Sequence, residues 1–190
     1  MKKRICEYFD AEKKENYTSY GNIPPRLMRQ ERDWTCSVAA VRTILSAFVG
    51  RHLTETDFIT KYNLAPGPHY TEEILNKKMF GDNKKILSHL DFHKEDISLK
   101  LLNNLLARKY YIMAECMYNY AHWVVILAYL VIRNKSDTEE HQILFYDPYY
   151  DETRLVRADE FATMWCDPDG HYREFIAVAN NRKQNLMRHN

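Results

Sequence analysis

The sequence predicts one α+β domain in which helices come first and an antiparallel sheet follows. Through the first half of the chain, apolar residues recur at helical spacing; after about residue 110 they run in strand-sized segments rich in Val and Ile. The 190 residues are enough for one domain with a hydrophobic core, and they contain no internal repeat or linker. Together these observations indicate N-terminal helices packed on an antiparallel sheet.

The chain divides into three parts by composition. Residues 1–20 are charged and weakly patterned, and we expect them to form a flexible lead-in. Residues 21–180 carry the periodic segments and form the predicted domain. Residues 181–190 are polar, and we expect a disordered tail.

The first predicted helix begins at Cys36. Its apolar face is formed by residues at helical spacing: Val38, Val41, Leu45 and Phe48. Asp33 or Thr35 can cap its N-terminus, and Gly50 suits a C-terminal stop. Cys36 is therefore expected in the first turn of the helix.

Further helices are expected before the sheet begins. Thr54 and Asp57 resemble a capping box with a shorter acid, and they open a helix that ends near Tyr62. Residues 72–80 and 85–92 are expected to be helical, with a turn at residues 81–83. A clearer helix opens at Ser98 and ends near Arg108 and Lys109, and its apolar face comprises Leu99, Leu102, Leu105 and Leu106.

The sheet is predicted from residue 110 onward. The expected strands are residues 110–117, 122–132, 141–146, 154–156 and 174–179, with a helix at residues 158–165 between the last two. Residues 133–140 form a polar hairpin tip that joins the second and third of these strands.

Composition and charge exclude several classes of protein. The net charge of +1 gives no electrostatic basis for binding nucleic acid or an anionic membrane. Neither a signal-peptide core nor an apolar run of membrane-spanning length is found. The four cysteines are far apart and form no Cys-x-x-Cys pair, which predicts reduced thiols and a cytoplasmic setting, with a secreted or injected effector as the alternative.

Cys36 is the candidate nucleophile. The free N–H groups and the positive dipole end of a helix N-terminus favour a thiolate over a thiol. The alternative is a small buried apolar residue, because free cysteines are often packed in cores. A catalytic role therefore requires a base and an orienting group elsewhere in the chain.

His122 and Asp147 are the candidate partners of Cys36. His122 begins one predicted strand and Asp147 ends the next, before Pro148. Because adjacent antiparallel strands bring the start of one beside the end of the other, both side chains are expected at the same edge of the sheet. The alternatives are a histidine at the rim of the sheet and an aspartate that only forms a turn before proline.

The remaining histidines and cysteines form no comparable set. His89 and His93 have the spacing of a metal-binding helix face, but no neighbouring glutamate or third ligand is recognisable. Cys116 and Cys166 are expected to be structural. No phosphate-binding loop or zinc-finger spacing is found, and neither a metal nor another cofactor is expected.

A set of short motifs carries a family resemblance that covers most of the chain, from about residue 23 to residue 179. The motifs are Ile23-Pro24, Gln30, Asp33-Trp34-Thr35-Cys36, Leu102, Ala107, Tyr111-Ile112, His122-Trp123-Val124-Val125, Asp147-Pro148, Phe161 and Trp165. This pattern resembles the double-glycine leader, bacteriocin-processing cysteine peptidases of the papain-like clan. The resemblance implies a papain-like fold, with Cys36 as nucleophile, His122 as general base, Asp147 orienting the histidine and Gln30 donating to the oxyanion.

The sequence also departs from that family. Ser37 stands where the family usually has glycine, and the hairpin between His122 and Asp147 is longer. The family's peptidases are typically fused to a membrane transporter, whereas here a stand-alone domain is expected.

These observations predict a cysteine hydrolase that cleaves a peptide or related acyl bond in a peptide or protein substrate. Tyrosines near the two catalytic strand ends are candidates for lining the substrate cleft: Tyr118, Tyr120, Tyr149 and Tyr150. Two alternatives remain: a cysteine acyltransferase of the transpeptidase or transglutaminase kind, and a non-catalytic interaction module on the same scaffold. The sequence does not determine the substrate or the oligomeric state.

Overall fold

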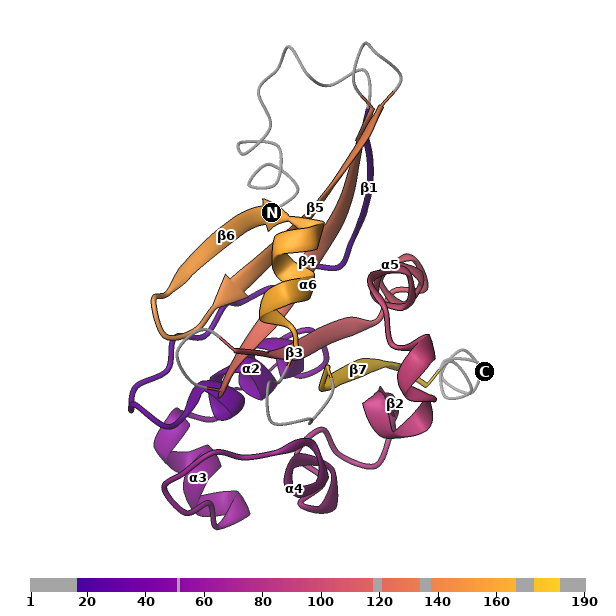
Figure 1. Cartoon of the computed structure of the whole chain (residues 1–190). Coiled ribbons are helices and arrows are strands. Elements are labelled where there is room, and N and C mark those ends of the chain that lie inside the picture. The colour runs from indigo at the N-terminus through magenta and orange to yellow at the C-terminus, as the bar shows by residue number, and fades with distance from the viewer. Residues whose placement is uncertain (1–16, 51, 118–120, 134–137, 167–172, 182–190) are drawn as a thin grey trace.

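A seven-stranded antiparallel sheet organises the structure, a computed structural model that describes residues 17–50, 52–117, 121–133, 138–166 and 173–181 (Figure 1). The strands are β1 (Tyr17–Gly21), β2 (Lys84–Ser88), β3 (Tyr111–Met117), β4 (Ala121–Arg133), β5 (Glu139–Asp147), β6 (Glu152–Arg157) and β7 (Phe175–Asn180). Their order is β2-β7-β3-β4-β5-β6, and β1 pairs with β4.

Helices cover both faces of the sheet. They are α2 (Cys36–Leu45), α3 (Glu55–Tyr62), α4 (Thr71–Asn76), α5 (Leu99–Ala107) and α6 (Ala158–Met164). One core cluster joins α2, α3 and α4 to side chains such as Trp123 and Val125, and the other joins α5 and α6 to Val124 and Ile126. Because successive residues of β4 enter opposite clusters, this strand is apolar on both faces and reads as a continuous hydrophobic run.

Local sequence signals account for several element boundaries. The Thr54 side chain accepts the Asp57 N–H at 3.1 Å, which caps α3 as predicted. The Ser98 hydroxyl caps α5 in the same way, by accepting the Leu101 N–H. Gly21 ends β1 where a Cβ would meet the Leu127 carbonyl oxygen at 3.0 Å, so a larger residue would have to push this strand away from β4 by a few tenths of an ångström.

The structure corrects four predicted boundaries. Residues 85–92 are not a helix: β2 ends at Ser88 and pairs with β7, and a short 3₁₀ turn (His89–Asp91) follows. This apolar segment is too short to show a helical or a strand period. Its pairing at the edge of the sheet decides its conformation. The helix expected at residues 72–80 ends at Asn76.

The other two corrections concern the end of the predicted lead-in and the C-terminus of the first predicted helix. Residues 17–20, assigned to the lead-in, belong to β1 and pair with β4. The α2 helix ends at Leu45 with Ser46 as its C-cap, so Gly50 does not terminate it. The rest of the expected lead-in (residues 1–16) and most of the tail (residues 182–190) lie outside the described residues. No helix among the described residues is both long and apolar enough to cross a membrane.

Candidate active site

Cys36 is the first residue of α2, as the sequence predicts. The helix packs through Val38 and Val41 against the core that includes β4, so its N-terminus is fixed beside the sheet. The predicted side-chain cap is absent: the Thr35 hydroxyl donates instead to the Arg32 carbonyl at 2.8 Å. The Cys36 N–H lies in the first turn, where backbone N–H groups have no partner within the helix.

His122 and Asp147 meet at one end of the β4–β5 pair. The last paired residues there are Val125 and Tyr146, so His122 precedes and Asp147 follows the end of the ladder. The His122 Nε2 and Asp147 Oδ1 atoms are 2.7 Å apart, and both side chains are buried. The hairpin geometry therefore places these two residues together, as the order of the strands predicts.

Cys36 lies beside His122, and its hydrogen-bonding and charge interactions help to raise the pKa of the ring. Because Nε2 is engaged by Asp147, Nδ1 is the ring nitrogen that serves the thiol. Burial by itself lowers the pKa of His122, but the hydrogen bonds and charges of Asp147 and Cys36 outweigh burial and raise the pKa to about 9. The imidazole is therefore protonated at neutral pH while it contacts the sulfur.

Asp147 is held as a carboxylate. Burial favours its neutral form, but the His122 hydrogen bond and charge, with the N–H groups of Tyr149 and Tyr150, hold its pKa below the ordinary value. Asp147 Oδ1 accepts the Tyr149 N–H at 3.0 Å as well as the His122 proton. The second oxygen, Oδ2, is buried with no hydrogen-bond partner among the described residues.

Gln30 lies on the loop that leads into α2. Its backbone N–H donates to the Pro148 carbonyl at 3.0 Å, which ties this loop to the end of β5 beside Asp147. Its side chain is buried, and Nε2 donates to the Arg32 carbonyl at 2.9 Å. An amide nitrogen carries two hydrogens, so one N–H of Gln30 is left for another acceptor.

The structure describes two of the four tyrosines that were expected near the cleft. Tyr149 lies with its ring edge-on to the His122 ring, the centroids 6.3 Å apart, and Tyr150 packs against Tyr149 at 5.0 Å. Both rings are exposed, 38% for Tyr149 and 62% for Tyr150. Tyr118 and Tyr120 lie outside the described residues.

Ser37 has a partner that sequence reasoning missed. Its hydroxyl is buried and lies 3.1 Å from Nδ1 of His69, on the loop before α4. Trp123, which follows the candidate base, donates its indole N–H to the His69 carbonyl at 3.0 Å. The pKa of His69 is lowered, chiefly by burial, which favours the neutral ring. The serine thus fits the start of α2 through a contact that no local signal reveals.

Glu55 is a second buried residue that the sequence did not reveal. Its carboxylate oxygen Oε2 accepts the Glu31 N–H at 2.9 Å, and Arg42 Nη1 lies 3.8 Å from the same oxygen. Burial raises the pKa of Glu55 against these partners. Glu55 therefore holds the start of the short loop between Gln30 and Cys36 through the Glu31 N–H, although its position in α3 looks like that of an ordinary first-turn acid.

The other thiols and histidines stand apart from this site. Cys116 is fully buried, as expected, and burial raises its pKa. Cys166, expected to be structural, is instead exposed, because it follows the end of α6. His89 begins one 3₁₀ turn and His93 precedes a second, so the two residues do not share a helix face. Within the described part of the chain, no group of three or more His, Cys, Asp or Glu side chains is placed to hold a metal ion.

The site therefore combines a thiol at a helix N-terminus, a protonated imidazole in contact with it and a buried carboxylate on the far side of the ring. This is the arrangement by which a cysteine can attack an acyl carbon. The chain matches no family model, and no curated protein matches it. The proposal that follows rests on the residues themselves.

Proposed function

We propose that the protein is a papain-like cysteine hydrolase that cleaves a peptide or related acyl bond through a Cys36 thioester. The observation that carries the proposal is the buried 2.7 Å contact between His122 Nε2 and Asp147 Oδ1, together with Cys36 close enough to the same ring to raise its pKa. Burying an ion pair costs free energy unless its two members are hydrogen-bonded to each other. A histidine at the surface needs no buried carboxylate as its partner.

The acylation step uses the charges of the resting site. With its proton already on His122, the Cys36 sulfur attacks the acyl carbon as a thiolate and forms a C–S bond, while the carbonyl electrons move onto oxygen. When the tetrahedral intermediate collapses, the bond to the leaving group breaks and the His122 imidazolium gives the leaving group its proton. A pKa of about 9 suits this role, because His122 holds that proton through the neutral range.

The deacylation step returns the site to its starting state. His122, now neutral, takes a proton from water, and the water oxygen attacks the thioester carbon. The C–S bond then breaks, the carboxylic acid leaves and Cys36 is restored. Asp147 keeps Nε2 protonated and the ring in position through both steps.

The oxyanion is stabilised by two donors close to the nucleophile. One is the Cys36 N–H at the start of α2, and the other is the second N–H of the Gln30 amide. Each donor of this kind contributes about 3 to 4 kcal/mol to the transition state in a comparable hydrolase. The backbone bond from Gln30 to Pro148 holds the amide donor in register with the histidine and aspartate.

An intermediate-trapping experiment tests the proposal. The protein is incubated with a library of peptide esters and quenched in acid, and the Cys36 peptide is analysed by mass spectrometry. We expect an acyl adduct on Cys36, with none on the exposed thiol of Cys166. In the His122→Gln variant the adduct should be lost. Absence of any acyl adduct on Cys36 in the wild type would refute the proposal. Transfer of the acyl group to added amines in preference to water would make the protein an acyltransferase.

A further inference from the structure

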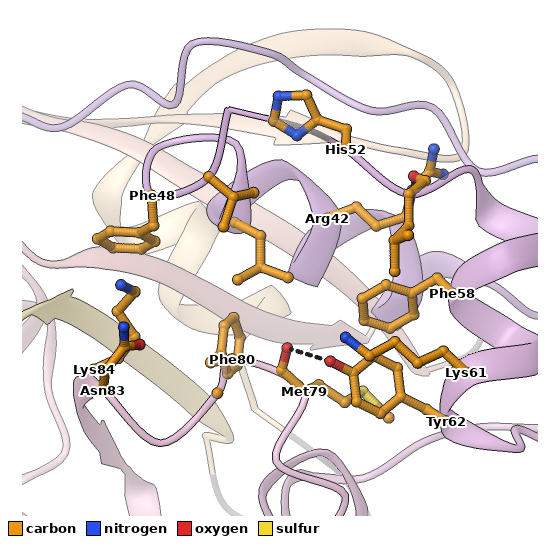
Figure 2. Close-up of a pocket in the computed structure, with 14 residues that line it drawn as sticks. Arg42, Phe48, His52, Phe58, Lys61, Tyr62, Met79, Phe80, Asn83 and Lys84 are labelled. Carbon is orange, nitrogen blue, oxygen red and sulfur yellow. Dashed lines mark hydrogen bonds between the residues drawn. The ribbon is translucent and has the colours of Figure 1, made fainter.

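A cavity of about 310 Å³ lies at the opposite end of α2 from Cys36 (Figure 2). It is enclosed by the C-terminal part of α2, the turn that follows it, α3 and the segment leading into β2, which places Leu45, Phe58 and Phe80 among its walls. At 1.5 Å per residue, the helix separates the cavity from the catalytic thiol by roughly 13 Å. The cavity is therefore distinct from the candidate active site.

The walls combine aromatic rings with cations. The aromatic side chains are Phe48, Phe58, Tyr62 and Phe80, and the basic ones are Arg42, His52, Lys61 and Lys84. None of the described residues that line the cavity is an aspartate or a glutamate. Its volume lies at the small end of the range for ligand pockets, roughly 300 to 1,000 Å³.

The two lysines of the cavity lack acidic partners among the described residues. Lys84 Nζ lies 4.8 Å from the centre of the Phe48 ring, and Lys61 Nζ lies 5.0 Å from the centre of the Tyr62 ring. Figure 2 shows these lysines on opposite sides of the cavity with Phe80 between them. Partial burial lowers the pKa of Lys84, so water does not fully solvate its charge.

The other two basic groups add little net positive charge. Arg42 Nη1 lies 3.7 Å from Glu31 and 3.8 Å from Glu55, so its charge is partly neutralised. The pKa of His52 is lowered by burial and by the charges of Arg26 and Arg42, which leaves a neutral ring able to donate an N–H. No anionic side chain of the described chain offsets the lysines.

We propose that this cavity is a binding site for a small organic anion with a flat apolar body. The negative group is held by the lysine ammonium groups, each of which lies near an aromatic ring. The flat body lies against the partly exposed side chains of Leu45, Phe48 and Leu53, where apolar burial adds to the charge interaction. The proposal concerns a second site and does not depend on the chemistry of Cys36.

A pair of fluorescent probes tests both parts of the ligand. 8-Anilinonaphthalene-1-sulfonate carries the anion and the flat body, and N-phenyl-1-naphthylamine has the same rings without the sulfonate. We expect the sulfonate to bind with saturation and at least about tenfold more tightly than the neutral probe. The Lys61→Gln, Lys84→Gln double variant should raise the Kd of the sulfonate by about tenfold or more and leave the Kd of the neutral probe unchanged.

A matched control separates the cavity from general surface charge. Lys85 is adjacent in the sequence to Lys84 but is exposed and does not line the cavity, so Lys85→Gln should leave the Kd of the sulfonate unchanged. Thermal unfolding of each variant verifies that it is folded. Equal binding of the two probes, or equal binding of the sulfonate by the wild type and the double variant, would overturn the proposal.

Competition then identifies the anionic group. 1-Naphthylacetate and 1-naphthyl phosphate are added in turn to the protein with bound sulfonate probe. Displacement by the carboxylate assigns the site to aromatic carboxylates, and displacement by the phosphate assigns it to phosphate esters. If neither compound displaces the probe, the proposal fails. Alkylation of Cys36 should be unaffected in the lysine variants, which keeps this test separate from that of the active site.

Discussion

Replacing Asp147 distinguishes the two ways in which a buried carboxylate can assist His122. Asp147 Oδ1 accepts the proton of His122 Nε2 at 2.7 Å, which orients the ring, and its negative charge stabilises the imidazolium. Asp147→Asn keeps an acceptor oxygen and removes the charge. Asp147→Ala removes both, and it also leaves the Tyr149 N–H without its acceptor.

The expected size of the effect follows from the pKa of His122. The rise from 6.5 to about 9 corresponds to about 3 kcal/mol in favour of the imidazolium. Asp147 supplies a hydrogen bond and a negative charge that raise the pKa of His122, and an opposite charge in direct contact shifts a pKa by about 1 to 3 units. Removing the negative charge of Asp147 lowers the pKa of His122. The ring therefore loses its proton at a lower pH in the variant than in the wild type.

The assay follows the imidazole and the thiol separately. The pKa of His122 is measured by NMR titration of its ring in ¹⁵N-labelled protein, and the reactivity of Cys36 by the rate of iodoacetamide labelling against pH. In Asp147→Asn we expect the pKa to fall by about 1 to 3 units while labelling at pH 6 stays within a few-fold of wild type. Turnover should keep its acidic limb, and its basic limb should move down with the pKa.

The alanine variant should behave differently, because the ring loses its acceptor. We expect labelling of Cys36 at pH 6 to fall by about tenfold or more, since a buried hydrogen bond to a charged group is worth about 1.5 to 3 kcal/mol. Near-wild-type titration and labelling in both variants would refute the reasoning. Asp147 would then only terminate β5, and the site would be a Cys–His dyad.

Three further predictions test the rest of the site. Brief iodoacetamide labelling at pH 6 should modify Cys36 well before the exposed Cys166, and equal labelling of the two would contradict the nucleophile assignment. Gln30→Ala should lower turnover of a fluorogenic peptide substrate by about 100-fold while leaving alkylation of Cys36 nearly intact, because the amide contacts the oxyanion and not the sulfur; parallel loss of both would show a disrupted site. Replacing the tip beyond the Arg133–Glu139 pair by an Asn-Gly turn should preserve the melting temperature and activity, since the tip is about 36 Å along β4 from His122; a folded but inactive product would make the tip a recognition element.

Much of the fold was predictable because its signals are local. The Thr54 and Ser98 caps mark their helices, and the Val- and Ile-rich run after His122 marks a central strand. The helix predicted at residues 85–92 was wrong, because a short segment carries no decisive period. Pairing of β2 with β7 settles its conformation. The strand β1 was also missed, because its conformation depends on pairing with β4, which is distant in the sequence.

The sequence by itself predicted most of the helices and strands, although not β1 or β2, and it proposed the three residues of the candidate site. Cys36 is fixed by the start of an amphipathic helix, and His122 and Asp147 are brought together by hairpin connectivity, which is a property of chain order. Tertiary structure decided what surrounds them. The contacts of Ser37 with His69 and of Glu55 with the Glu31 N–H join segments that are distant in the chain.

The cavity at the far end of α2 was also decided only in three dimensions. Lys61 and Lys84 look like ordinary surface charges in the sequence, because neither neighbours the other or an unusual motif. Packing of α2 and α3 with the segment before β2 brings them to one cavity and leaves them without carboxylate partners among the described residues. Periodicity records which residues are buried, but the positions of polar groups around a cavity depend on contacts between elements, which no local pattern encodes.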